Sequence, residues 1–498
     1  MPARLLARIV LALAAAAAVA AIAVLSPAPA PAGAQAGERL NVVVLMTDDQ
    51  TAAAMRAMPI TRQLIGGEGV TFDNSFVSYA LCCPSRATFL TGQYAHNHHV
   101  LRNVWPLGGY YRLHGDQTLP VWLEAAGYRT MMVGRYLNEY GRRDPTEIPP
   151  GWTDWHALVD PTTHHYYGFK VNENGTVRAF PDTPENYQTT VLTRKTVHLI
   201  HDAADDGKPF FIWTAYTAPH YGYGKSSKEP DDPPGMKTPV PAPRDRDKFA
   251  KEPLPTPPDF DERDMSDKPR TIRNLPRITP RKRAAIQENY QQELETLQAV
   301  DRGVASIVDA LQATGQLDRT LIVFTSDNGY YHGEHRIARE KTRPYDPAIR
   351  VPLLVRGPGI PRGVRRLQFV SNQDLTSTVL DVAGAEAALP QDGMSLLPLI
   401  HRPHFVPARD LLIEGVTSVG QQRVDFAGIR SPNWFYAEYT NGDRELYDLK
   451  ADPYELTSRA GKKRYAAIQA ELAQRVAALR TCSGASCLER PAGGTTPR

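Results

Sequence analysis

The chain is organised around residues 81–92, which read LCCPSRATFLTG. Pro84 suits the first turn of a helix, where its missing backbone N–H costs no hydrogen bond. The stretch therefore predicts a loop that delivers Cys82 to the N-terminus of a helix. Backbone N–H groups and the helix dipole favour an anion at such a place, and Arg86 adds a planar cationic group. On residue type alone, the two cysteines also fit small buried side chains or half of a disulfide.

The order of residues in this stretch, C-x-P-S-R followed by A-T-x-L-T-G, resembles the signature of the type I sulfatases in the alkaline-phosphatase-like superfamily. The resemblance implies that Cys82 is oxidised after translation to formylglycine, whose hydrate is the nucleophile. It also implies a formylglycine-generating enzyme as a partner. Cys83 fills the variable position of the motif and is expected to remain a buried thiol.

The composition favours a globular protein with nearly balanced charge. The 498 residues are enough for a large core and more than one domain. Lys and Arg number 57 against 54 Asp and Glu, so the formal net charge is only +3. A nearly balanced charge gives no argument for nucleic acid or a membrane surface as the main partner.

The first 36 residues have the pattern of a secretory signal peptide. Arg4 and Arg8 form a basic end, residues 9–25 are apolar or Ala, and residues 34–36 read AQA, a small-residue cleavage pattern. We expect cleavage after this pattern and a secreted or otherwise extracytoplasmic protein with no membrane contact. An uncleaved anchor is the alternative, because about 17 apolar residues is near the lower limit for a membrane span.

Two apolar segments of strand length each end in oxygen-bearing side chains. Residues 40–46 lead to Asp48 and Asp49, and residues 320–326 lead to Asp327-Asn328. Asp48 and Asp49 alone also fit helix capping. Together they suit one hard cation, Ca²⁺ or Mg²⁺, and no Cys or His pattern for zinc accompanies them. In the superfamily that the chain resembles, four such residues hold one cation beside the nucleophile. The resemblance therefore gives a metal-ligand set of Asp48, Asp49, Cys82, Asp327 and Asn328.

Three further side chains complete the site that the resemblance implies. Arg135 follows a predicted strand at 128–133, where the family usually has Lys, so the charge is kept while the geometry changes. His220 follows a predicted strand at 210–214, and Lys341 is expected to contact the sulfate and the leaving-group oxygen. Without the resemblance, all three also fit surface loops or a surface ion pair. The predicted catalytic set is Cys82, Arg86, Arg135, His220 and Lys341.

Other histidines have less defined roles. His96, His98 and His99 belong to a string that occurs in similar sulfatases, but they also fit packing or capping of the helix after residue 82. His335 matches a position of the glucosamine-6-sulfatase-like group. Residues 136–140, YLNEY, resemble the same group and its relatives that act on sulfated glycosaminoglycans. We leave these histidines out of the catalytic set.

The pattern as a whole predicts an α/β fold: a large mixed, mostly parallel sheet flanked by helices, alkaline-phosphatase-like, with a small C-terminal α+β subdomain. Apolar residues from Ile286 to Leu311 recur every three or four positions and predict a long helix. Cys482 and Cys487 predict a small disulfide loop in an exported protein. The predicted domains are a signal peptide at 1–36, a catalytic domain at 37–400 with a Pro-rich surface insertion at 222–282, a C-terminal subdomain at 401–487, and a disordered tail at 488–498.

The sequence thus predicts an exported sulfatase that hydrolyses sulfate esters. The expected substrates are aryl sulfates and sulfated sugars such as 6-sulfated N-acetylglucosamine. A sulfate ester is an anion, so its attack requires cations around it, and the predicted site supplies them. Two alternatives remain: a phosphonate monoester or phosphodiester hydrolase of the same superfamily, and a non-catalytic carbohydrate-binding homologue.

Overall fold

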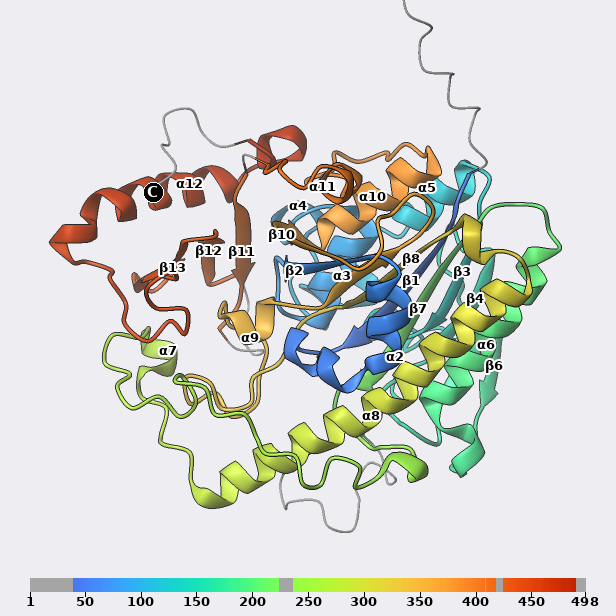
Figure 1. The fold of residues 1–498 in the computed structure, drawn as a ribbon, viewed down its shortest axis with the longest axis horizontal. Coiled ribbons are helices and arrows are strands. Elements are labelled where there is room, and N and C mark those ends of the chain that lie inside the picture. Colours follow the sequence, from blue (N-terminus) through green and yellow to red (C-terminus); the bar gives the residue numbers. More distant parts are fainter. Residues whose placement is uncertain (1–38, 224–235, 408, 418–423, 490–498) are drawn as a thin grey trace, which may run out of the picture. The chain divides into compact units, whose positions relative to one another are not determined.

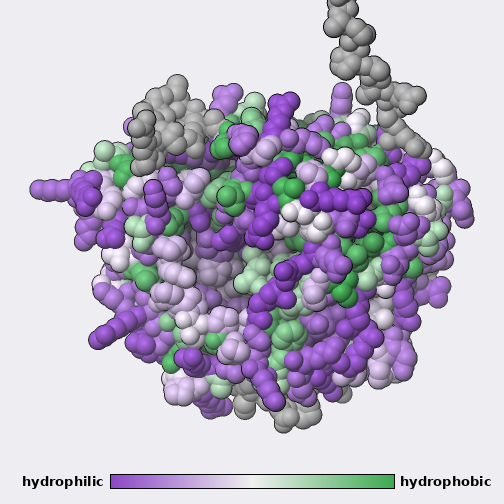
Figure 2. Space-filling model, in the orientation of Figure 1, coloured by the Kyte–Doolittle hydropathy of each residue, from purple (hydrophilic) through white to green (hydrophobic). Residues whose placement is uncertain are grey.

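The computed structural model describes residues 39–223, 236–407, 409–417 and 424–489 (Figure 1). The predicted signal peptide at 1–36 lies outside these residues, as does all but the first two residues of the predicted tail at 488–498. In the described part of the chain, no helix is long and apolar enough to cross a membrane. Figure 2 shows hydrophilic side chains over most of the visible face, with hydrophobic residues in small scattered patches.

The main sheet has ten strands among the described residues, in the order β10-β2-β9-β8-β1-β7-β3-β4-β5-β6. The run from β8 to β4 is parallel throughout, β10 pairs parallel with β2, and the other neighbours are antiparallel. The mixed, mostly parallel sheet confirms the predicted fold class. The strands are β1 (Asn41–Asp48), β2 (Val70–Phe76), β3 (Arg129–Gly134), β4 (Asp154–Leu158), β5 (Lys170–Glu173), β6 (Thr176–Ala179), β7 (Phe210–Pro219), β8 (Thr320–Ser326), β9 (Leu353–Arg356) and β10 (Val364–Ser371).

Helices lie between these strands and after them. The described α-helices are α2 (Pro59–Thr61), α3 (Cys82–Thr91), α4 (Ala95–His98), α5 (Leu119–Ala125), α6 (Gln188–Ala204), α7 (Arg270–Arg273), α8 (Pro280–Ala313), α9 (Asp346–Ile349), α10 (Gln373–Ala383), α11 (Leu397–His401) and α12 (Ala466–Leu479). Short 3₁₀ or π turns are η1 (Ala52–Ala57), η2 (Arg62–Gly67), η3 (Tyr110–Arg112), η4 (Pro184–Asn186), η5 (Pro243–Asp245), η6 (Leu317–Arg319), η7 (Lys463–Tyr465) and η8 (Gly484–Cys487).

Helices cover both faces of the main sheet (Figure 1). On one face, α6 and α8 share a buried core with Val43, Leu45 and Ile212. On the other face, α3, α5 and α10 share a second core with Val44 and Trp213. Successive residues of β1 point to opposite faces and are apolar on both, as expected for the middle of a parallel sheet.

The predicted long helix is α8. It begins at Pro280, six residues before the first predicted apolar position, because Thr279 caps it by accepting a hydrogen bond from the backbone N–H of Lys282. It ends at Ala313, two residues before Gly315. Gly315 has a φ of +68°, a left-handed backbone conformation that residues with a Cβ atom rarely adopt and that commonly follows the end of a helix.

The C-terminal part contains a four-stranded antiparallel sheet among its described residues, in the order β11-β12-β13-β14. Apolar residues on one face pack against α12, and those on the other face pack against α9 and the loop around Tyr331. Cys482 and Cys487 form the predicted disulfide, and Cys83 is a buried free thiol as predicted. The strands are β11 (Leu411–Gly415), β12 (Phe426–Arg430), β13 (Trp434–Tyr439) and β14 (Arg444–Asp448).

The predicted insertion at 222–282 is more deeply packed than a surface excursion. Met236, Val240 and Leu254 belong to the core that contains α8, and Met265 and Ile272 belong to the core beneath the C-terminal sheet. These apolar residues are irregularly spaced, so their burial could not be predicted from a helical or strand periodicity.

Candidate active site

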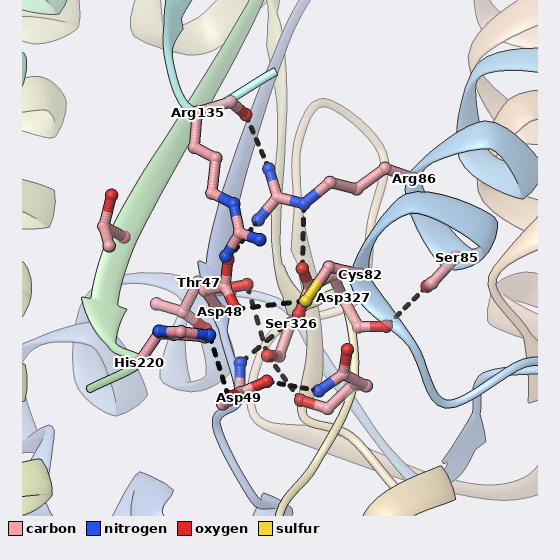
Figure 3. A network of polar contacts seen from close by, with 12 residues as sticks. Thr47, Asp48, Asp49, Cys82, Ser85, Arg86, Arg135, His220, Ser326 and Asp327 are labelled. Atoms are coloured by element: carbon pink, nitrogen blue, oxygen red, sulfur yellow. Dashed lines mark hydrogen bonds and ion pairs between the residues drawn. The ribbon is translucent and has the colours of Figure 1, made fainter. Parts of the chain in front are cut away.

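The carboxyl ends of the central parallel strands bring the predicted site residues together. β1 lies between β7 and β8, so Asp48, His220 and Asp327 leave neighbouring strands at one rim of the sheet. Cys82 is the first residue of α3, and its Sγ lies 3.8 Å from Oδ1 of Asp48. Figure 3 shows these side chains pointing toward one another.

Three carboxylates at this rim form a group that fits a hard metal ion. Oxygen atoms of Asp48, Asp49 and Asp327 lie within 4.8 Å of one another, and all three residues are buried. Oδ2 of Asp49 and Oδ1 of Asn328 are buried with no hydrogen-bond partner in the described part of the chain. Burial raises the pKa of Asp49, although nearby Lys341 opposes that shift. Oxygens left unpaired in this way are costly unless a ligand binds them, and an oxygen-only set suits Ca²⁺ or Mg²⁺.

A second group of possible ligand atoms shares Asp48 with the first. It combines Asp48, Cys82 and His220 within the same distance. Sulfur and nitrogen donors suit zinc, but a thiol must lose its proton to bind metal. Burial raises the pKa of Cys82 to about 12, so the thiol keeps its proton at neutral pH. The oxygen-only group needs no such change and is the better fit.

Two arginines link the carboxylates from the other side. Nε of Arg86 donates to Asp327 at 2.8 Å, and its Nη2 donates to Asp48 at 3.0 Å. Nη1 of Arg135 contacts the same carboxylate of Asp48, and Nη2 of Arg135 donates to Asn138 at 3.2 Å. Both guanidinium groups are buried, which excludes a surface ion pair as the role of Arg135. Burial also lowers the pKa of Arg135.

Lys341 reaches the site from the loop that follows β8. Its Nζ donates to Oδ1 of Asp49 at 2.5 Å and to Sγ of Cys82 at 2.9 Å. Burial alone would lower the pKa of Lys341, but Asp49 and Cys82 raise it above its usual value. The ammonium group is therefore charged and touches the atom that the sequence predicts as the nucleophile's precursor.

His220 faces the site in a defined orientation. Its Nδ1 lies 2.7 Å from the backbone oxygen of Tyr221. A carbonyl oxygen only accepts, so Nδ1 carries the hydrogen and Nε2 is left with a lone pair in the neutral ring. Nε2 lies 3.7 Å from Oδ2 of Asp49. Burial, together with Lys341 and His164, holds the pKa of His220 well below its ordinary value.

His164 also belongs to this region, although the sequence analysis missed it. Its ring lies 4.5 Å from the ring of His220, centre to centre, and it is buried with an unpartnered Nε2 in the described structure. Burial and the nearby guanidinium of Arg135 hold the pKa of His164 well below the ordinary value. His164 follows β4, a strand parallel to β3. Ligands bind outside the carboxyl ends of parallel strands, so the reasoning that places His220 in the site applies to His164 as well.

Three other histidines named in the sequence analysis contact residues outside this site. His98 is buried against Oγ1 of Thr88 at 3.1 Å, and His96 lies 3.2 Å from a carboxylate oxygen of Glu414. His335 lies 2.7 Å from Glu262 of the insertion. The nine residues of the predicted catalytic and metal sets, in contrast, form one buried contact network: Asp48, Asp49, Cys82, Arg86, Arg135, His220, Asp327, Asn328 and Lys341.

Comparison with known proteins gives this network a family. A family model described as Sulfatase matches residues 40–385, and one described as N-sulphoglucosamine sulphohydrolase, C-terminal, matches residues 333–482. An arylsulfatase of Volvox carteri is 33% identical over 91% of this chain and 76% of its own length. The N-acetylglucosamine-6-sulfatase of Homo sapiens is 33% identical over 91% of this chain and 87% of its own length.

Solved structures agree with the sequence relatives. One of them, a protein in complex with its substrate D-glucosamine-2-N,6-O-disulfate, superposes with a TM-score of 0.72 at 26% identity. The match covers 88% of this chain and 97% of that protein. Family match, identity and fold therefore lead to one conclusion: this chain belongs to the sulfatase family and is a sulfuric ester hydrolase.

Proposed function

We propose that this sulfatase is exported and removes sulfate from sulfated sugars, with 6-sulfated N-acetylglucosamine among its substrates. It would act through formylglycine at position 82 and one divalent cation. The observation that carries this proposal is the pairing of three buried cationic side chains with three buried carboxylates around Cys82: Arg86, Arg135 and Lys341 with Asp48, Asp49 and Asp327.

The protonation state of the Cys82 thiol supports the proposal that this residue must be oxidised before it can act as the nucleophile. The pKa of about 12 leaves the thiol protonated at neutral pH, and the thiolate is the reactive form of cysteine. Hydrated formylglycine, when present, supplies a hydroxyl group for attack and a second hydroxyl that allows sulfate to be released. Cys83 is an unsuitable alternative because its Sγ accepts a hydrogen bond from the backbone N–H of Asn138 at 3.1 Å and the residue is buried in the core that contains Trp213.

The divalent cation would be held by Asp48, Asp49, Asp327 and Asn328. Its chemistry is that of a Lewis acid, which polarises a sulfate oxygen. The unpartnered oxygens of Asp49 and Asn328 favour these two residues as ligands. Ca²⁺ and Mg²⁺ both suit such donors.

The remaining charge of the sulfate group would be stabilised by the cationic side chains. Arg86 is fixed between two carboxylates, so its guanidinium needs no rearrangement to meet an anion. Lys341 carries protons at Nζ and lies 2.9 Å from Sγ of Cys82. We therefore assign the protonation of the leaving alkoxide to Lys341. His220 has a bare Nε2 in its neutral form, which suits a hydrogen-bond acceptor beside the reacting atoms.

The proposed substrate class rests on the relatives. The Homo sapiens relative is named an N-acetylglucosamine-6-sulfatase, and the substrate in the superposed structure is a 6-O-sulfated glucosamine. A phosphonate or phosphodiester hydrolase is the alternative within the same superfamily.

The test compares two preparations of the protein, one produced together with a formylglycine-generating enzyme and one produced without it. We expect sulfate release from N-acetylglucosamine 6-sulfate and from 4-nitrophenyl sulfate only in the first preparation. The mass of the peptide that contains residue 82 should show loss of the thiol there. Cys82→Ala should be inactive, while Cys83→Ala, at a neighbouring buried position, should keep activity if it folds.

Two outcomes contradict the proposal. Equal activity with and without the modifying enzyme would exclude formylglycine as the nucleophile. Faster turnover of phenylphosphonate than of either sulfate ester would favour the phosphonate hydrolase. Export is tested separately, because a mature N-terminus near Gly37 in the culture medium or periplasm is expected from residues 1–36.

A further inference from the structure

A band of exposed basic side chains runs from α7 to the first turn of α8. Residues 268–287 contain seven basic residues and no acidic residue, so their formal charge is +7. The whole chain carries only +3, which leaves 3 − 7 = −4 for the remaining residues. All but Lys268 of the seven are exposed. We call these six the basic band: Arg270, Arg273, Arg277, Arg281, Lys282 and Arg283.

The charge of the basic band is only partly neutralised by the protein itself. Arg277 pairs with Asp261 at 2.8 Å, and Arg270 lies 3.4 Å from Asp443. Arg281 and Lys282 form no ion pair with the described residues, and the guanidinium of Arg283 lies over the ring of Phe260 at 5.1 Å. At least three positive charges of the band therefore face solvent without an acidic partner.

The position of these three charges is unfavourable for the isolated fold. They occupy the first turn of α8, a helix of 34 residues that has no acidic residue in that turn. The positive end of the helix dipole lies there, and it favours acidic residues over basic ones. The three charges are thus repelled by the dipole of the helix that carries them, whereas an anionic partner on the surface would be attracted by both the side chains and the dipole.

The basic band is attached to the loop that carries the site. The backbone N–H of Asp261 donates to the carbonyl of Gly333 at 2.9 Å, and Nη1 of Arg336 donates to the carbonyl of Leu275 at 2.8 Å. This loop runs from Asn328 to Lys341. The band is thus attached to the same loop as Lys341, and Figure 1 shows α7 and the start of α8 on the side of the C-terminal sheet.

We propose that the basic band is a binding surface for a polyanionic sulfated glycan, separate from the catalytic site, that retains a polymer while single sulfate esters are hydrolysed. This rests on the proposed function, because a polymeric sulfated substrate is what the band would hold. Arginine suits this partner, since its planar group pairs with the two oxygens of a sulfate in a fork-like geometry.

Other polyanionic partners fit the band less well. Residues 268–287 contain no aromatic residue, whereas single-stranded nucleic acid is held by stacking on aromatic rings. An amphipathic helix binds a membrane surface through an exposed apolar face beside its cations. Here Ile272 is buried and Leu275 and Ile278 are half-buried, so the apolar side of this segment is already used for packing.

The test uses the full chain with residue 82 modified and the triple variant Arg281→Glu, Lys282→Glu, Arg283→Glu. Acidic residues suit the first turn of a helix, so α8 should form at least as well in the variant. We expect the Kd for dextran sulfate at 0.15 M salt to rise by about tenfold or more, and the salt needed for elution from heparin–agarose to fall. KM for a sulfated polysaccharide should rise, while kcat/KM for 4-nitrophenyl sulfate should stay within about twofold of wild type.

The matched control is the triple variant Lys462→Glu, Lys463→Glu, Arg464→Glu, which changes charge equally at three exposed basic residues before α12. It should bind dextran sulfate nearly as wild type does. Equal losses in both triple variants would overturn the proposal, because net charge alone would then explain the binding. Tighter retention on single-stranded DNA or on anionic vesicles than on heparin would also overturn it. Binding is measured without turnover, so an inactive enzyme that still shows the difference would contradict only the proposed function.

Discussion

Replacing Arg135 is the most direct test of how the site handles charge. Its guanidinium is 1% exposed and contacts Asp48, so Arg135→Ala leaves a buried carboxylate with one cationic neighbour fewer. At an effective dielectric constant of about 20, a cation about 4 Å from a bound sulfate contributes about 4 kcal/mol. Loss of one preorganised donor to an oxyanion costs about 10²–10³ in rate. We therefore expect kcat/KM for an aryl sulfate to fall by about 10²–10³ in Arg135→Ala.

The conservative variant separates charge from folding. Removing one partner of a buried ion pair destabilises a protein by about 3–5 kcal/mol, so the thermal midpoint and the metal content of each variant must be measured. Arg135→Lys keeps the charge and should retain activity within about tenfold of wild type. Arg129→Ala is the control on the same strand, since Arg129 pairs with Asp154 at 2.7 Å near the surface, where such pairs contribute about 0–1 kcal/mol.

Two results would refute this reasoning about Arg135. The first is a kcat/KM of Arg135→Ala within about threefold of wild type, which would show that the guanidinium does not stabilise the reacting sulfate. The second is an Arg135→Lys variant that is folded, equally modified at position 82, and as inactive as Arg135→Ala. Geometry and not charge would then be the property that the site requires.

Three other predictions address the rest of the site and the stability of the fold. Asp49→Ala and Asp327→Ala should each lose activity and, by elemental analysis, bound metal. Treatment of wild type with a chelator should abolish activity, and added metal should restore it. An enzyme that is active without metal would contradict the proposed metal site. Cys82→Ala should abolish turnover, whereas Cys83→Ala should mainly lower the thermal midpoint, because that thiol is buried in the apolar core. Burial holds the pKa of His98 at about 3 against 6.5 when exposed, so the unfolded chain alone binds this proton between those values. This proton alone should therefore lower the free energy of unfolding by about 1.4 kcal/mol per pH unit as pH decreases from 6.5 toward 3, and His98→Gln should reduce the slope measured for wild type by that amount.

The sequence was sufficient for the centre of the fold because that part follows simple rules. β1 ends in Asp48 and β8 is followed by Asp327, and both strands are buried and apolar on both faces, so strand and site could be predicted together. The strand order could not be predicted, since register and neighbours depend on packing between distant segments. Only the structure places β1 between β7 and β8, and so brings His220 to the acids.

His164 shows why part of the site was not found. β4 has five residues and includes Asp154 and His156, so its pattern lacks the apolar run that marked the other strands. Because β4 was not predicted as a strand, His164 could not be placed at the carboxyl end of one. The short strand is recognisable only because it pairs in parallel with β3.

The charges of the site also explain how metal and substrate would depend on each other. Asp48, Asp49 and Asp327 balance Arg86, Arg135 and Lys341, so these six buried side chains carry no formal net charge. A bound divalent cation would raise this to +2, and a sulfate monoester, with one negative charge, would then reduce it to +1. Each ligand therefore favours the other, and by linkage the two effects on affinity must be equal. Inorganic sulfate should tighten metal binding by the same factor by which the metal tightens sulfate binding. Arg135→Ala should lower sulfate affinity while leaving the metal bound at least as tightly, because it removes a cation that repels the metal.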